Sequence, residues 1–88
     1  MKTIFKYMLN PGYQVLELPG DEIVILSVGV QHGQIVLWAM IDTESPKHEI
    51  GVQVVGTGWK LSGLEDWHFI GTVQVDNLVW HIFTGEKG

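Results

Sequence analysis

Cysteine and arginine are both absent from this chain of 88 residues. Without cysteine, neither a disulfide nor a thiolate metal site can stabilise the fold, and nothing indicates an oxidising compartment. All five basic residues are lysines, spread along the sequence against ten acids, for a net charge of -5. A nucleic-acid interface needs clustered Lys and Arg, so we expect no nucleic-acid partner.

Long apolar runs are also missing. No segment approaches the ~20 apolar residues of a membrane span, and the first residues lack the apolar stretch of a signal peptide. We therefore expect a cytoplasmic protein with no membrane partner.

Large apolar side chains, by contrast, are abundant. The chain is 45% hydrophobic and contains four tryptophans, more than the core of one small domain easily absorbs. Some of this surface is expected at an interface, so the composition favours a homo-oligomer.

The segment from Ile23 to Asp42 predicts a β-hairpin with His32 and Gly33 as its two turn residues. In that register one face is entirely apolar and is assigned to the core. It pairs Val24 with Ile41, Leu26 with Ala39, Val28 with Leu37 and Val30 with Ile35. A slip of one residue would destroy this match, which supports the register.

The opposite face of this hairpin is mixed but is not a solvent face. It pairs Ile23 with Asp42, Ile25 with Met40, Ser27 with Trp38 and Gly29 with Val36. We expect either that Trp38 lies across its neighbours or that Gly29 leaves room for another backbone or a ligand. Val36, Trp38 and Met40 are therefore candidate binding residues.

A second hairpin is predicted from Trp67 to Phe83, with Asp76 and Asn77 in the turn. Its expected core face carries Phe69, Gly71, Val73, Val75, Leu78, Trp80 and Ile82. Further strands are expected at Thr3 to Met8, Gln14 to Leu18 and His48 to Gly56, and Ser62 to Glu65 has capping-box spacing for at most one helical turn. The prediction is an all-β domain over residues 1–84, of about seven antiparallel strands in a small sandwich or partly closed barrel, with a frayed tail at 85–88.

Catalytic and metal-ligating patterns are weak. In the predicted register His81 faces Thr72, whereas His68 is four residues away from Thr72, about 13 Å along the strand. The serines lack a nucleophile-elbow context, and the acids fall at turns and strand ends. We therefore expect no enzyme, no metal and no cofactor.

Gly56, Thr57 and Gly58 form a glycine-flanked turn followed by Trp59 and Lys60. Glycines taking positive φ at a strand end explain this pattern simply. Free amides beside an aromatic and a cation also suit a small pocket for a nucleotide-like ligand. All five residues are candidate binding residues.

Four stretches give the string a family likeness: Met1 to Tyr7, Ile25 to Val28 with the following Leu37-Trp38-Ala39, Gly56-Thr57-Gly58, and Ile70-Gly71-Thr72 with Leu78 to Phe83. The chain thereby resembles a family of short uncharacterised proteins encoded by tailed bacteriophages and prophages. This resemblance implies an accessory protein in the cytoplasm of the bacterial host, without assigned chemistry. Together with the residues, it suggests binding to a host protein or small ligand, with inhibition of host antiviral defence as one specific form. A small structural component of the virion is the alternative.

Overall fold

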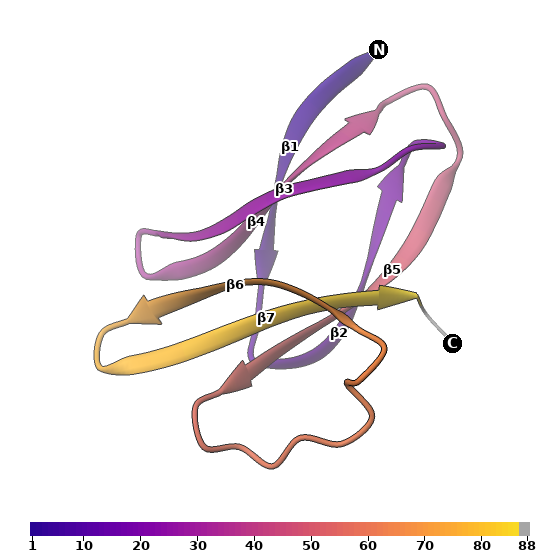
Figure 1. Ribbon diagram of the computed structural model, residues 1–88. Coiled ribbons are helices and arrows are strands. Elements are labelled where there is room, and N and C mark those ends of the chain that lie inside the picture. The colour runs from indigo at the N-terminus through magenta and orange to yellow at the C-terminus, as the bar shows by residue number, and fades with distance from the viewer. Residues whose placement is uncertain (87–88) are drawn as a thin grey trace.

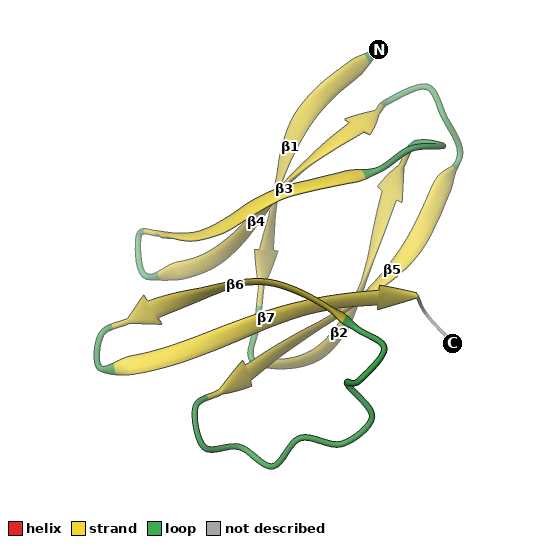
Figure 2. Ribbon diagram, viewed as in Figure 1, coloured by secondary structure: helices red, strands yellow, loops and turns green. Residues whose placement is uncertain are grey.

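The protein is a two-layered β-sandwich, seen in a computed structural model that describes residues 1–86 (Figures 1 and 2). It has seven strands, all paired antiparallel, and no helix within those residues. The strands are β1 (Lys2–Leu9), β2 (Gly12–Pro19), β3 (Val24–Gln31), β4 (Gln34–Asp42), β5 (Lys47–Gly56), β6 (His68–Val75) and β7 (Leu78–Glu86). The predicted all-β fold with seven antiparallel strands is confirmed.

The strands form two separate sheets. Sheet A has the order β1-β4-β3 and sheet B the order β2-β5-β7-β6. The two sheets do not close on each other, so the sandwich alternative holds rather than the barrel. The β3–β4 and β6–β7 hairpins belong to different sheets and point in the same direction (Figure 1).

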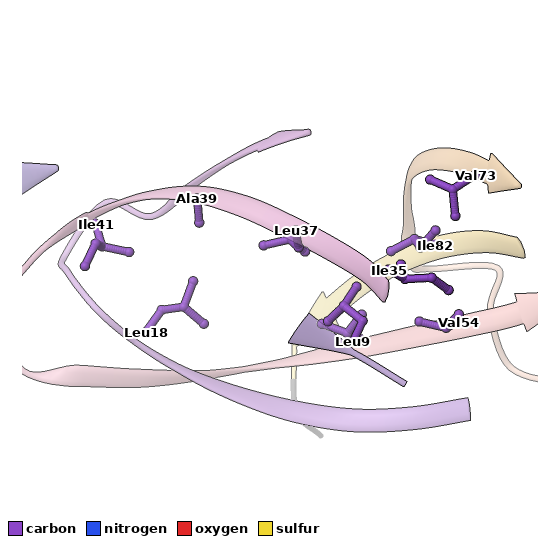
Figure 3. Packing of buried hydrophobic residues seen from close by; sticks show 10 residues of the cluster. Leu9, Leu18, Ile35, Leu37, Ala39, Ile41, Val54, Val73 and Ile82 are labelled. Atoms are coloured by element: carbon purple, nitrogen blue, oxygen red, sulfur yellow. The ribbon is translucent and has the colours of Figure 1, made fainter. Parts of the chain in front are cut away.

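The core lies between the sheets. Strand β4 supplies one side through the alternate residues Ile35, Leu37, Ala39 and Ile41, which face Leu18 and Val54 of sheet B (Figure 3). Each of these side chains is at most 4% exposed. The alternation of β4 and of β5 thus follows the pattern that the sequence predicted.

The β3–β4 hairpin has the predicted turn but a broken register. His32 and Gly33 have φ values of 51° and 75°, as a type I′ turn requires. Val28 pairs with Leu37 and Gly29 with Val36, as predicted, but a β-bulge at Leu26 shifts the pairing beyond it. Val24 therefore pairs with Met40 and is 46% exposed on the outside, so its assignment to the core was wrong, as were the four pairs predicted beyond Ser27.

The β6–β7 hairpin repeats this arrangement. Its predicted register holds from Gly71 to Val75, and a bulge at Ile70 shifts the rest. Ile70 turns toward the core, while Phe69 pairs with Phe83 and is 57% exposed, contrary to prediction. Residues 26 and 70 each lie six positions before the first turn residue, His32 or Asp76. The three-strand units β1-β4-β3 and β5-β7-β6 also share one strand order, whereas β2 has no counterpart in the second unit.

The segment from Ser62 to Glu65, for which at most one helical turn was predicted, contains no helix. It belongs to the connection between β5 and β6, where Trp67 N donates to Leu64 O at 3.1 Å. The frayed tail predicted for 85–88 is wrong for its first two residues, which belong to strand β7. Gly85 pairs with Gly51 of β5, and Glu86 pairs with Ile50 of β5. The rest of that tail, 87–88, lies outside the described residues.

Candidate functional site: the outer face of sheet A

The first predicted cluster lies on the side of sheet A that faces away from sheet B. We call this side the outer face of sheet A. It is formed by the side chains that alternate along each strand with those that point into the core. They are Ile4, Lys6 and Met8 of β1, Val36, Trp38 and Met40 of β4, and Val24, Ser27 and Gly29 of β3. Ile4 and Met8 are 55% and 68% exposed, so the face is largely apolar and open.

Trp38 occupies the space above Gly29. A Cβ atom on Gly29 would lie 3.0 Å from Cζ3 of the indole, closer than side chains normally approach. Of the two predicted alternatives, the first holds: the indole lies across the strand and fills the space beside Gly29, so that space is not left for another backbone or a ligand. An aromatic covering a strand glycine restores packing that glycine itself cannot provide.

Val36 is only 1% exposed even though it lies on the outer face. Lys6 Nζ donates a hydrogen bond to Gln31 Oε1 at 2.8 Å, from β1 on one side of β4 to β3 on the other. Lys6 pairs with Trp38 and Gln31 with Gln34, so the bond crosses β4 at the level of Val36. A lysine stem that crosses a strand in this way can shield apolar surface beneath it while its ammonium stays solvated.

Met40 lies between two adjoining hollows of the outer face. One, of about 300 Å³, is lined by Lys2, Asp21, Glu22, Val24, Met40, Ile41, Asp42 and Ser45. The other, of about 380 Å³, is lined by Lys2, Thr3, Ile4 and Met40. The first hollow is thus lined by three carboxylates as well as by Val24, Met40 and Ile41, and Lys2 is the one cation among its lining residues.

The amino group of Met1 holds one of these carboxylates. It donates to Asp42 Oδ1 at 2.8 Å and to Glu44 Oε2 at 3.4 Å. The hydrogen bond between the Met1 amino group and Asp42 lowers the pKa of the Asp42 carboxyl below its ordinary value. The same bond raises the pKa of the amino group. Asp42 is therefore ionised at neutral pH and its charge is part of the rim.

The second predicted cluster lies at the end of sheet B and is not joined to the first. Thr57 N donates to Val79 O and Trp59 N to Gly56 O, each at 3.1 Å. Two of the amides proposed for an anion are therefore occupied by backbone carbonyls. Trp59 covers Gly56, where a Cβ would lie 2.7 Å from its Nε1, and meets Trp80 edge-on at a ring separation of 5.4 Å.

Trp59 forms a wall between two shallow depressions. One includes Leu78 and Trp80 and has a volume of about 330 Å³; the other includes Leu61, His81 and Phe83 and has a volume of about 220 Å³. Lys60 is exposed and lines neither depression. The predicted combination of aromatic, cation and free amides is thus not assembled at one point.

His81 connects the Gly56–Lys60 turn to the hairpin. Its Nε2 lies 2.7 Å from Thr57 Oγ1, and its Nδ1 lies 3.0 Å from Thr72 Oγ1. Thr72 is the cross-strand partner that the sequence predicted for His81. Both imidazole nitrogens are engaged with threonine hydroxyls, an arrangement that fixes the loop to the sheet.

Sequence reasoning missed a further depression, which opens between the sheets. It has a volume of about 550 Å³ and is lined by Ile23, Ile25, Ile50, Asp66, Trp67, His68, Thr84 and Gly85. These residues come from four segments far apart in the chain, so no local pattern marks them. Trp67 itself lies over the glycines of the two neighbouring strands, since a Cβ on Gly85 would meet its Cδ2 at 2.7 Å.

Within residues 1–86, no group of three or more His, Asp or Glu side chains is arranged to hold a metal ion. The same part of the chain contains no helix that could cross a membrane.

Comparison with known families gives one match. The chain belongs to the family of the domain of unknown function DUF7352, which covers residues 1–88. No curated protein and no solved structure matches it.

Proposed function

We propose that this DUF7352 protein is a non-enzymatic accessory protein of a tailed bacteriophage that binds a host protein through the outer face of sheet A. Inhibition of a host antiviral defence is one specific form of this function. The observation that supports the proposal is the apolar outer face itself, with exposed Ile4, Met8 and Val24 around the half-buried Trp38 and Met40.

The composition of this face suits a protein partner. Contiguous exposed apolar surface on a small soluble domain marks interaction sites, and Trp and Met are enriched at the centres of interfaces. Met40 between its two hollows offers the kind of depression that receives an apolar anchor from a partner.

The charges around Met40 favour a basic partner. Asp21 and Glu22 are exposed, and Asp42 is ionised beside them, while the whole chain carries a net charge of -5. A complementary positive surface would be steered toward this rim. We therefore propose a host protein that inserts an apolar side chain next to lysines or arginines.

A nucleotide-like ligand at Gly56, Thr57, Gly58, Trp59 and Lys60 has less support. The amides of Thr57 and Trp59 already donate to backbone carbonyls, so a phosphate would have to displace them. The Thr57, His81 and Thr72 contacts likewise join the loop to the sheet.

The test compares Met40→Lys with Leu61→Lys. Both place a cation at an apolar surface position, but Leu61 is 53% exposed on the β5–β6 connection, away from the outer face. Tagged wild type and both variants are expressed in the host during infection, and co-purifying proteins are quantified by mass spectrometry. The best candidate is then purified and its affinity measured by calorimetry at two salt concentrations.

We expect one basic host protein whose affinity falls about tenfold or more with Met40→Lys, is unchanged with Leu61→Lys, and weakens with added salt. Equal affinity of the two variants would refute the assignment to the outer face. Recovery of the protein in stoichiometric amounts from purified virions would instead favour the alternative, a structural component of the particle.

A further inference from the structure

The two sheets have four edge strands, and three of them carry features that block further pairing. These edges are β1 and β3 of sheet A and β2 and β6 of sheet B. Exposed strand edges recruit other strands unless bulges, prolines or charges prevent it. The condition of each edge therefore indicates where another chain can add.

The free edges of strands β3 and β6 are unsuited to pairing with a further strand. Each contains a bulge, at Leu26 and at Ile70. They also approach closely, because a Cβ on Gly71 would lie only 2.8 Å from Cγ2 of Val28. Strand β2 carries Glu17 and ends at Pro19, which has no amide hydrogen to donate.

Strand β1 is the regular edge. It pairs with β4 without interruption from Lys2 opposite Asp42 to Leu9 opposite Ile35, with no bulge and no proline. Apolar side chains are exposed on both of its faces, Ile4 and Met8 on the outer one and Phe5, 45% exposed, on the inner one. A long regular strand with such flanks is a template for antiparallel addition.

Lys6, the lysine at the centre of β1, is turned away from this edge, and Lys2 lies at the first position of the strand. A charged side chain on an edge strand normally discourages pairing. Lys6 instead reaches across β4 to donate to Gln31 at 2.8 Å, so its ammonium lies over the interior of sheet A. The free side of β1 is left without its central charge.

We propose that β1 pairs antiparallel with β1 of a second copy of this chain, about a two-fold axis at Phe5. Residues that face each other in an antiparallel pair have side chains on the same side of the sheet, and side chains alternate between the two sides along each strand. A residue of one copy can therefore face only itself or a residue an even number of positions away, so the two-fold axis must lie at a residue and not between two residues. With the axis at Phe5, the two Phe5 rings meet, Ile4 faces Lys6 of the second copy, and Lys2 faces Met8.

Neighbouring registers are less favourable. An axis at Lys6 places the two Lys6 residues opposite each other, and an axis at Ile4 places Lys2 opposite Lys6 of the second copy. Like charges directly opposite destabilise a strand pair, whereas an aromatic pair stabilises it. With the axis at Phe5, no lysine faces another lysine, and most residues of β1 still have a partner in the second copy.

The result is one six-stranded sheet in which the outer faces of both copies become continuous. This inference does not depend on the host partner proposed above, because the dimer forms along the free backbone edge of β1, whereas the host partner would bind the outer face, to which Ile4 and Met8 of β1 also belong. Met40→Lys is expected to leave the dimer intact, so failure of either proposal is recognisable separately.

The first experiment measures mass by light scattering and native mass spectrometry at about 100 µM. Wild type is expected to be dimeric. Phe5→Lys should raise the dimer dissociation constant by about tenfold or more, because it places two cations opposite each other. Phe69→Lys is the matched control, a comparably exposed phenylalanine on sheet B, and should remain dimeric.

The second experiment tests the register with single cysteines, which is possible because the chain has none of its own. Directly opposed residues have Cα atoms about 4.5 to 5.5 Å apart, within disulfide range. Phe5→Cys should therefore form a covalent dimer under mild oxidation, whereas Met8→Cys, whose copies would be about 20 Å apart, should not.

A monomeric wild type at about 100 µM would overturn the proposal. This holds also if β1 then pairs with a strand of another protein, because the proposal names a second copy of this chain. A dimer that Phe5→Lys does not weaken would place the interface elsewhere. Cross-linking through Lys6→Cys in preference to Phe5→Cys would refute the register.

Discussion

The indole of Trp38 occupies the volume that a side chain on Gly29 would need, with Cζ3 only 3.0 Å from the position of the absent Cβ. Trp59 has the same relation to Gly56, and Trp67 to Gly51 and Gly85. Three of the four tryptophans thus lie over strand glycines. They cover the sheets from outside or at their ends, which explains how a small domain accommodates so much aromatic surface.

Gly29→Val is expected to displace this indole and to lower the free energy of unfolding by about 1 to 3 kcal/mol, as overpacking does. Urea denaturation followed by fluorescence measures the change. In a Trp38→Ala background the same substitution should cost less, with a coupling energy of about 0.5 kcal/mol or more. Additive effects of the two substitutions would contradict the contact.

His32→Asn is expected to stabilise the protein by up to about 1 kcal/mol. His32 has a φ of 51° at the first position of a type I′ turn, and asparagine adopts this left-handed conformation with less strain. Denaturation midpoints of wild type and variant measure the gain. His68→Asn, in the extended strand β6, serves as the control and should give no gain; equal effects would show that the turn is not responsible.

Thr57→Val removes the hydroxyl that contacts His81 Nε2 at 2.7 Å. We expect a loss of about 0.5 to 1.5 kcal/mol, the usual net value of one such hydrogen bond. Faster amide hydrogen exchange in residues 57–67 should accompany it, because the bond fixes this connection to the sheet. Thr57→Ser retains the hydroxyl and should behave like wild type; if it exchanges as fast as Thr57→Val, the hydrogen bond is not the cause.

The pair between Met1 and Asp42 predicts pH dependence at both ends of the range. The pKa of Asp42 is lowered, so its stabilisation is present above the ordinary carboxyl pKa of about 3.9 and is lost as pH falls through the lowered value. The pKa of the Met1 amino group is raised, so its contribution is present below about 8 and is lost as pH rises through the raised value.

An NMR titration of the Asp42 carboxyl carbon measures the first shift directly. Asp42→Asn should return the pKa of the amino group toward its ordinary value. The thermal midpoint should hardly change, because both groups are exposed to solvent. An ordinary pKa for Asp42 in the wild type would show that the pair does not persist in solution.

The sequence by itself determined the seven strands, both hairpin turns and the register next to each turn. These features depend on local chemistry: alternation of apolar residues, turn residues at fixed positions, and the short closure between paired strands. His32-Gly33 and Asp76-Asn77 specify where their hairpins reverse, and the pairs from Gly71 to Val75 follow directly.

Only the tertiary structure decided where the registers break and what covers each face. No glycine or proline adjoins Leu26, and Gly71, which directly follows Ile70, was assigned to the core face rather than to a bulge. Each bulge places apolar side chains against the opposite sheet, which the sequence of one strand cannot specify. For the same reason the sequence could indicate Val36, Trp38 and Met40 as a surface in need of cover, but not that Lys6 reaches across β4 at the level of Val36. That path depends on Gln31, two strands away, accepting the hydrogen bond from Lys6.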